Sequence, residues 1–252
     1  MELAGRTAVV IGGTSGIGKA LALGLARAGA DVIATSRSED AVKETAAEIR
    51  ALGRETLELP SDVLQRDSLQ LLLNTTLRRF NRVDILVNAA GITRREPTLE
   101  LSEETWNAIL EVNLHGTLRA CQVFGTQMIA QNYGRIINIA SLSSFVAFQE
   151  VTAYCASKAA VASLTRSLAV EWSKHGVLVN AIAPGIFPTA LNSRILDSPR
   201  GQELQMRTPL ARFGATDELV STAIYLASEN TSFTSGQVIA VDGGFLASGV
   251  NQ

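Results

Sequence analysis

The chain of 252 residues is 46% hydrophobic and 18% charged, a composition that excludes a disordered polymer and predicts one globular domain over residues 1–252. Its formal net charge is -2, from 22 basic and 24 acidic residues, which provides no general electrostatic attraction to nucleic acid or anionic lipid. We therefore expect neither nucleic acid nor a membrane as a partner.

The only cysteines are Cys121 and Cys155, which form no C-x-x-C pair, and this favours a reducing, cytoplasmic location. The amino terminus lacks the basic and apolar regions of a signal peptide, and no apolar run reaches the roughly 18 residues that a membrane span needs. His115 and His175 stand outside any metal-ligand motif, so no bound metal is expected.

Short β-branched runs alternate with longer helical patterns from the amino terminus onward. Strand 7–11, helix 17–28, strand 31–36 and helix 40–52 set the order. Further strands are predicted at 55–59, 85–88, 135–140, 178–182 and 237–241. This alternation predicts βαβ units, and hence an α/β fold with a doubly wound parallel sheet of about seven strands flanked by helices.

One long stretch, 184–216, shows no clear helix or strand pattern and contains Pro188, Pro199 and Pro209. A loop of this length inside a compact domain is usually functional. We therefore expect a substrate lid at about 186–216.

A glycine-rich turn joins the first strand to the first helix. The candidate phosphate-binding residues of this turn are Gly12, Thr14, Ser15, Gly16, Ile17 and Gly18. Glycine allows a close approach of the backbone, and a helix N-terminus offers free amides and partial positive charge to a pyrophosphate. A purely structural turn would show the same spacing, but the surrounding βαβ pattern favours a dinucleotide site.

The end of the second strand predicts which nicotinamide cofactor is preferred. An acidic residue there would hydrogen-bond the ribose 2′-hydroxyl of NAD and repel the 2′-phosphate of NADP. This chain has Ser36 and Arg37 instead, and arginine offers a planar, permanently charged donor to phosphate. NADP is therefore favoured over NAD, with an ordinary surface arginine as the alternative interpretation.

Tyr154 and Lys158 lie four residues apart at the start of a long helical pattern, so both occupy one helix face, one turn apart. A nearby ammonium lowers the pKa of a phenol, which suits Tyr154 for proton exchange with a carbonyl or alcohol. Ser141, thirteen residues earlier, would hydrogen-bond the same substrate oxygen. Taken alone, the spacing of Tyr154 and Lys158 also describes an exposed pair without function.

Taken together, Gly12-x3-Gly16-x-Gly18, Asn88, Asn113, Ser141 and Tyr154-x3-Lys158 occur in an order that resembles the short-chain dehydrogenase/reductase family over nearly the whole chain. The resemblance implies a single Rossmann-fold domain and an NAD(P)-dependent oxidoreductase acting on CH–OH groups. It implies that Tyr154 is the acid/base, that Lys158 also holds the nicotinamide ribose, and that Asn113 completes a catalytic tetrad by supporting a water-linked proton relay. A homotetramer is implied as well.

By the same resemblance, a second set of residues contacts the cofactor. These are Asp62, Val63, Asn88, Tyr154, Lys158, Gly185, Ile186 and Thr189. For Asp62, a helix N-cap is the alternative role.

The substrate is expected to contact Ser141, Ser143, Gln149, Tyr154 and the lid. Residues 92–97 and the lid look most similar to the gluconate 5-dehydrogenase branch of the family, which acts on sugar acids and polyols. Arg94 would then bind a carboxylate bidentately, with an ordinary surface charge as the alternative. Two other functions stay open: a 3-oxoacyl-acyl-carrier-protein reductase, which shares nearly every motif, and an NADP-binding sensor or scaffold that has lost turnover.

Overall fold

The computed structural model describes residues 2–189 and 198–249. Its centre is one parallel sheet with the strand order β2-β1-β3-β4-β5-β6. The strands are β1 (Thr7–Ile11), β2 (Asp31–Thr35), β3 (Ile85–Asn88), β4 (Gly134–Ile139), β5 (Val177–Pro184) and β6 (Val238–Val241). The chain leaves β1 toward β2 and then returns to β3 on the other side of β1, which confirms the doubly wound α/β fold.

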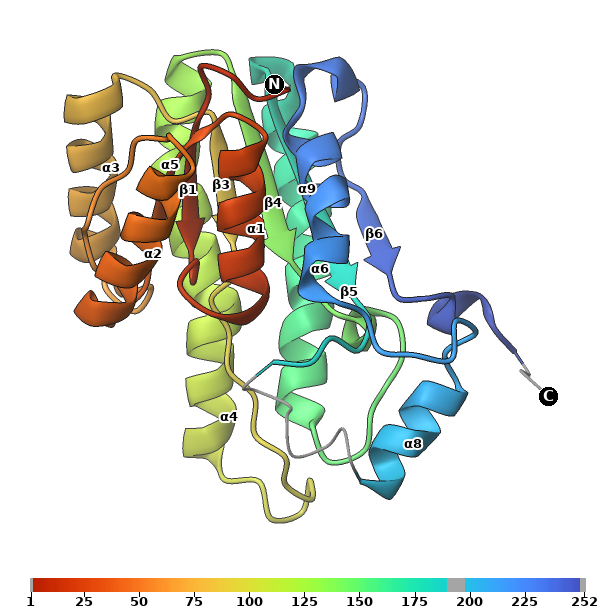
Figure 1. Ribbon diagram of the computed structural model, residues 1–252. Coiled ribbons are helices and arrows are strands. Elements are labelled where there is room, and N and C mark those ends of the chain that lie inside the picture. The colour runs from red at the N-terminus through yellow and green to blue at the C-terminus, as the bar shows by residue number, and fades with distance from the viewer. Residues whose placement is uncertain (1, 190–197, 250–252) are drawn as a thin grey trace.

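Helices cover both faces of the sheet (Figure 1). The covering helices are α1 (Gly16–Arg27), α2 (Glu39–Ala51), α3 (Arg66–Phe80), α5 (Gly116–Ala130), α6 (Thr152–Trp172) and α9 (Val220–Ala227), while α4 (Glu103–Leu110) and α8 (Pro199–Met206) lie beyond the end of the sheet (Figure 1). Among the residues that the structure describes, none of these helices is both long and apolar enough to cross a bilayer.

Alternate residues of each strand enter two separate cores. On one face Val10 of β1 packs with side chains of α1 and α9, and on the other face Val9 packs with side chains of α3, α5 and α6. A strand buried on both faces is apolar at consecutive positions, as the burial of all five residues of β1 illustrates. This is why the sequence reads as continuous apolar runs.

The strand predicted at 55–59 does not form, so the sheet has six strands instead of about seven. This segment runs beside β2, and the Glu55 carbonyl accepts a hydrogen bond from the Val32 amide (3.1 Å). Two further hydrogen bonds between this segment and β2 are made by side chains of β2. The Asp31 carboxylate accepts from the Glu55 amide (3.0 Å), and the Thr35 hydroxyl donates to the Leu59 carbonyl (2.7 Å). The β-branched pattern did not reveal that side chains would replace the backbone ladder.

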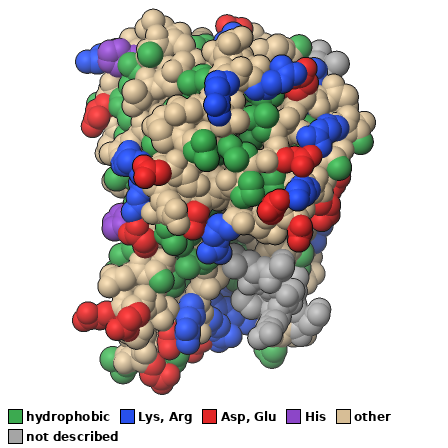
Figure 2. Space-filling view, turned by 90° about the vertical axis from the view of Figure 1, so that its left-hand side faces the viewer, with side chains coloured by type: hydrophobic (Ala, Val, Ile, Leu, Met, Phe, Trp, Pro, Cys, Tyr) green, Lys and Arg blue, Asp and Glu red, His purple; other side chains and the backbone are tan. Residues whose placement is uncertain are grey.

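Figure 2 shows the face that carries α3. Basic and acidic side chains are interspersed on it, with hydrophobic side chains between them. This face therefore offers no broad surface of one charge sign, in keeping with the small net charge.

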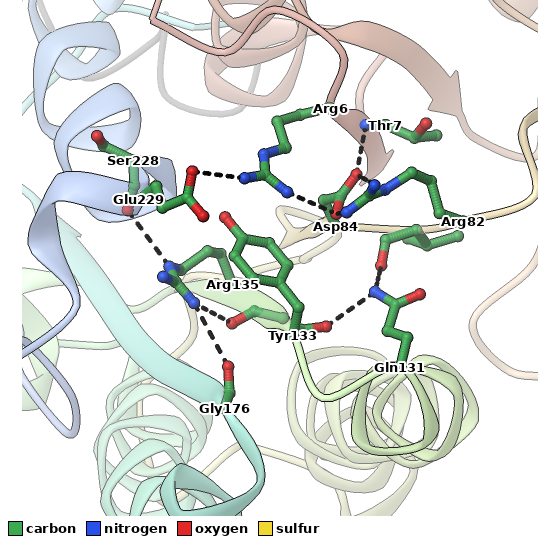
Figure 3. A network of polar contacts seen from close by, with 12 residues as sticks. Arg6, Thr7, Arg82, Asp84, Gln131, Tyr133, Arg135, Gly176, Ser228 and Glu229 are labelled. Atoms are coloured by element: carbon green, nitrogen blue, oxygen red, sulfur yellow. Dashed lines mark hydrogen bonds and ion pairs between the residues drawn. The ribbon is translucent and has the colours of Figure 1, made fainter.

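A polar cluster holds the amino-terminal ends of the strands together (Figure 3). Asp84, fully buried just before β3, accepts hydrogen bonds from the Thr7 amide (3.0 Å) and the Arg82 Nε (2.7 Å) and lies 3.4 Å from Arg6. The Tyr133 ring lies between two guanidinium groups, 4.3 Å from that of Arg6 and 4.5 Å from that of Arg135. These contacts fix one end of the sheet and leave its carboxyl-terminal end to carry the loops.

We predict that Asp84→Asn lowers the free energy of unfolding by about 3 kcal/mol, because it removes the charge of a buried carboxylate that faces two arginines. The matched control is Glu229→Gln, which removes the partner of Arg6 at an exposed position and should cost less than about 1 kcal/mol. Denaturant unfolding of both variants checks the difference. Equal losses would show that Asp84 has no special role.

Candidate active site

The residues expected to bind cofactor and substrate lie in loops at the carboxyl-terminal end of the sheet. The loops after β1, β2, β3, β4 and β5 all begin there, because parallel strands end at the same edge. In Figure 1 this edge faces downward, toward α4 and α8. A ligand site at this edge is the general arrangement in open α/β sheets.

The glycine-rich turn after β1 requires glycine at two positions. Gly12 has a φ of 76°, and a Cβ on it would lie 2.5 Å from the Ala90 amide nitrogen. A Cβ on Gly18 would lie 2.0 Å from the Gly12 carbonyl oxygen. The Gly12 and Gly13 amides both donate to the Thr35 carbonyl, at 2.8 and 3.0 Å. The turn is therefore held against β2 and β3 at once.

The N-terminus of α1 is available to an anion. Ser15 is the N-cap residue, and its side chain makes no capping hydrogen bond. Among the described residues, a Cβ built on Gly16 would meet only the Thr189 side chain, at 3.3 Å or more, so Thr189 lies across from the helix start. Free amides at an open helix N-terminus suit a pyrophosphate, and these residues therefore fit a dinucleotide.

Ser36 and Arg37, the residues expected to select the cofactor, follow β2. The Ser36 hydroxyl accepts a hydrogen bond from the Thr14 hydroxyl (2.8 Å), which joins the end of β2 to the glycine-rich turn. Arg37 is exposed and has no hydrogen bond or ion pair with any residue in the described part of the chain. Its guanidinium is free to bind a phosphate.

Asp62, Val63 and Asn88 use their side chains within the protein. The Asp62 carboxylate accepts from the Leu64 amide (3.0 Å), and the N-cap of α3 is Gln65, so Asp62 is not the N-cap. Val63 packs closely against Gly116, at the start of α5.

The Asn88 amide nitrogen donates to the Asn138 Oδ1 (2.9 Å) and to the Cys121 sulfur (3.3 Å). The Asn88 Oδ1 is buried and has no partner. Asn88 therefore connects β3 to β4 through its side-chain nitrogen.

Beyond β5, the loop is held against the carboxyl-terminal end of the chain. The Gly185 amide donates to the Val241 carbonyl (2.8 Å), and a Cβ on Gly185 would lie 2.7 Å from the Asp242 Cα. The Ile186 carbonyl accepts from the Gly214 amide (2.9 Å). Residues 190–197 of the expected lid lie outside the described residues.

Lys158 is the most constrained side chain of the site. It lies on the same face of α6 as Tyr154, with its Nζ 5.7 Å from the centre of the tyrosine ring. The Nζ donates to the Ile139 carbonyl at 2.6 Å, and only 5% of the surface of Lys158 is exposed. Burial lowers the pKa of Lys158 to about 8, because a buried ammonium loses its hydration.

Tyr154 keeps its proton at neutral pH in this environment. Burial raises its pKa above the ordinary value of 10, and a hydrogen bond with Ser141 acts in the opposite direction. Ser141 follows β4, and its hydroxyl accepts from the Ser143 amide (3.1 Å). The pKa of Tyr154 is therefore raised by burial, and not lowered as the sequence predicts from the charge of Lys158. The phenol is thus an acid that can donate to a carbonyl oxygen.

Asn113 lies in a π-helical turn, Glu111–His115, between α4 and α5. Its side-chain nitrogen donates to the Ile92 carbonyl (2.9 Å) and the Ser157 hydroxyl (3.0 Å), and its oxygen accepts from the Ile92 amide (2.8 Å). A Cβ on Gly91 would lie 3.3 Å from the Asn113 oxygen and 3.6 Å from the Lys158 Nζ. The structure therefore brings Asn113 next to Lys158.

The residues expected to contact substrate are spread over the rim. Ser143 is buried just behind Ser141, and Gln149 is exposed on the same loop. Arg94 has a 63% exposed side chain and lies 3.4 Å from Glu96. These residues belong to the loops after β3 and β4, which begin at the same end of the sheet.

The sequence analysis missed two features of the site. Helix α8 forms inside the stretch expected to lack regular structure, and its signal was present: Ser198 accepts from the Gly201 amide and Pro199 is the first helical residue. The Ile139 carbonyl holds Lys158, and a backbone acceptor leaves no trace in residue type.

Comparison with known proteins agrees with this geometry. The family model described as "Enoyl-(Acyl carrier protein) reductase" matches residues 12–246. The chain is 41% identical to the 2-dehydro-3-deoxy-D-gluconate 5-dehydrogenase of Escherichia coli (strain K12), covering 98% of this chain and 97% of the relative. It is 35% identical to the 3-oxoacyl-acyl-carrier-protein reductase of Thermotoga maritima, covering 98% of this chain and all of the relative.

Among solved structures, the gluconate 5-dehydrogenase of Burkholderia cenocepacia, in complex with NADP and tartrate, is 36% identical with a TM-score of 0.94. The alignment covers 98% of both chains. Identity of this level over nearly the full length, together with the assembled Ser141, Tyr154 and Lys158, places the chain in the short-chain dehydrogenase/reductase family as an NAD(P)-dependent enzyme.

Proposed function

We propose that the protein transfers hydride between NADP(H) and a carbonyl or secondary alcohol of a sugar acid or polyol, as a gluconate 5-dehydrogenase does. The observation that carries the proposal is the convergence of Ser141, Tyr154 and Lys158 at the same end of the sheet as the N-terminus of α1. A bound nicotinamide would supply or accept the hydride. The chain's own residues would bind the substrate oxygen and move its proton.

In the reducing direction, the protonated phenol of Tyr154 donates to the substrate carbonyl oxygen while Ser141 hydrogen-bonds the same oxygen. The phenolate that remains lies beside Lys158, which is charged below about pH 8, and the positive charge stabilises it. Oxidation of an alcohol runs through the same groups in reverse. Asn113, held beside Lys158, supports the relay that returns a proton to Tyr154.

The sugar-acid part of the proposal has two supports. Relatives that align over nearly the whole chain act on gluconate derivatives by name, and one solved relative contains tartrate, which is itself a hydroxy acid. The second support is the group of arginines at the rim. We infer a substrate lid at about 186–216, of which 190–197 lie outside the described residues, and propose Arg94 as a cation for the carboxylate.

The preference for NADP rests on Arg37. This guanidinium is exposed and unpaired within the described residues, and no acidic side chain takes the place of Ser36, which bonds to Thr14 instead. NADP is also the nucleotide in the Burkholderia cenocepacia complex.

We infer a homotetramer in a reducing compartment, the cytoplasm. The assembly is supported by β6, an edge strand that is only partly covered, and by exposed apolar side chains at Val170, Tyr225 and Phe233. The compartment is supported by Cys121 and Cys155, both of which are unpaired.

We predict that Arg37→Gln lowers kcat/KM for NADPH about tenfold or more, the value of a charge-assisted hydrogen bond, and leaves kcat/KM for NADH nearly unchanged. The matched control is Arg27→Gln, an exposed arginine at the other end of α1, which should alter neither. An equal loss of kcat/KM with NADPH and with NADH would show that Arg37 does not bind the 2′-phosphate.

The proposed function is tested with a panel of carbonyl compounds and NADPH. We expect reduction of 5-keto-gluconate by the wild type, and a loss of about 10²-fold or more in kcat for Tyr154→Phe, because the variant cannot donate a proton. Tyr225→Phe, which removes an exposed hydroxyl from α9, serves as the control with full activity.

Other outcomes of the panel favour other functions. Strong activity on an acetoacetyl thioester without activity on 5-keto-gluconate would favour the 3-oxoacyl reductase. Activity that Tyr154→Phe leaves intact would contradict the mechanism, and absence of turnover on every compound despite NADPH binding would favour a sensor or scaffold.

A further inference from the structure

The arginines of the segments that follow β3 and β5 differ in their partners. Four of them each lie within 4.0 Å of a carboxylate, in the pairs Arg94–Glu96, Arg95–Glu150, Arg207–Glu203 and Arg212–Glu218. Arg200, on α8, has no carboxylate partner among residues 2–189 and 198–249. In the lower part of Figure 2, too, basic and acidic side chains stand close together. A rim arginine without an acid is therefore distinctive.

Arg200 is held in place without being neutralised. Both of its terminal nitrogens donate to one acceptor, the backbone carbonyl oxygen of Gln149, at 3.1 Å each. A guanidinium presents two parallel N–H groups whose spacing matches the two oxygens of a carboxylate. In this structure both N–H groups share one neutral carbonyl oxygen. A carboxylate would accept each hydrogen bond with a separate oxygen and would also supply the opposite charge.

The acceptor of Arg200 belongs to the catalytic loop. Gln149 lies between Ser141, at the end of β4, and Tyr154, in the first turn of α6. A guanidinium fixed to the Gln149 carbonyl is therefore attached to the loop that joins Ser141 to Tyr154, the two residues that would bind the reacting oxygen.

The loop itself is fixed from other sides, which gives Arg200 a defined position. The Glu150 carbonyl accepts from the Glu96 amide (2.7 Å), and the Glu150 carboxylate accepts from the Arg95 Nε (2.6 Å). Glu150 has a φ of 65°, a conformation that a residue with a side chain keeps only where its surroundings hold it. Phe148 also packs against Phe245, with ring centres 6.0 Å apart.

We propose that Arg200 is a specificity-determining residue that binds the carboxylate of the substrate, exchanging the Gln149 carbonyl for the two oxygens of the acid. The inference rests on the proposed function and adds the residue that binds the carboxylate of the substrate. Arg94 would have to leave Glu96 to do the same. Arg200 leaves only a neutral acceptor, so its exchange is the easier one.

The test compares 5-keto-gluconate with its neutral amide, which keeps the reactive ketone and loses only the charge. For the wild type we expect kcat/KM to favour the acid by about tenfold or more, as a charge-assisted pair provides. Arg200→Gln should reduce this ratio to near one, mainly through KM for the acid. Arg200→Lys, which keeps the charge without the bidentate geometry, should give an intermediate ratio.

Two matched variants complete the design. Arg207→Gln, at the other end of α8, is the matched control and should keep the wild-type ratio, whereas Arg94→Gln tests the competing carboxylate site. If Arg200→Gln slows the acid and the amide equally, Arg200 only fastens α8 to the loop and the proposal is overturned. If Arg94→Gln abolishes the preference and Arg200→Gln does not, the carboxylate belongs to Arg94.

A failure of the proposed function gives a different result. A wild-type ratio near one would show that the site does not read the carboxylate at all, and would contradict the sugar-acid substrate before any variant is made. A wild-type preference that survives in Arg200→Gln contradicts only the role of Arg200.

Discussion

The hydrogen bond from the Lys158 ammonium to the Ile139 carbonyl, at 2.6 Å, is the contact on which the rest of the site depends. It joins α6 to the end of β4 at a nearly fully buried position, where an ammonium is stable only if it is hydrogen-bonded. Because Tyr154 lies one turn earlier on α6, the same contact sets the height of the phenol above the sheet. Ser141, two residues after Ile139, is placed by the same strand end.

A second set of buried polar contacts keeps α6 and the sheet in register. Asn88 donates to Asn138, and Asn138 donates to Thr165 on α6, each at 2.9 Å. At the other end of the helix segment, the Ser144 hydroxyl donates to the Lys158 carbonyl (2.7 Å). Buried polar groups that are hydrogen-bonded in this way specify one arrangement of the elements, which is what a site shared between α6 and the end of β4 requires.

The sequence predicted those parts of the site that depend on residue type and spacing. The glycines at 12, 16 and 18 and the four-residue interval from Tyr154 to Lys158 are patterns that only a few structures satisfy, and the strand-helix alternation fixed their context. The sequence did not predict the features that depend on backbone hydrogen bonds or on burial. The segment 55–59 looked like a strand because side-chain acceptors cannot be foreseen, the raised pKa of Tyr154 comes from burial, and the contact of Arg200 with Gln149 involves a carbonyl.

The most direct test of this account is the protonation state of Lys158. The chain has four lysines, Lys19, Lys43, Lys158 and Lys174, so the ¹³Cε signals of labelled lysine can be followed individually by NMR as pH rises, and the Lys158→Met variant identifies one of them. Hydrogen bonds with Glu48 and Glu39 raise the pKa values of Lys19 and Lys43, which separates their signals from that of Lys158. The account predicts that the signal missing from Lys158→Met titrates with a pKa of about 8. Titration at the ordinary value of 10.5 or above would show that the ammonium is not buried at the centre of the site, and would contradict the account.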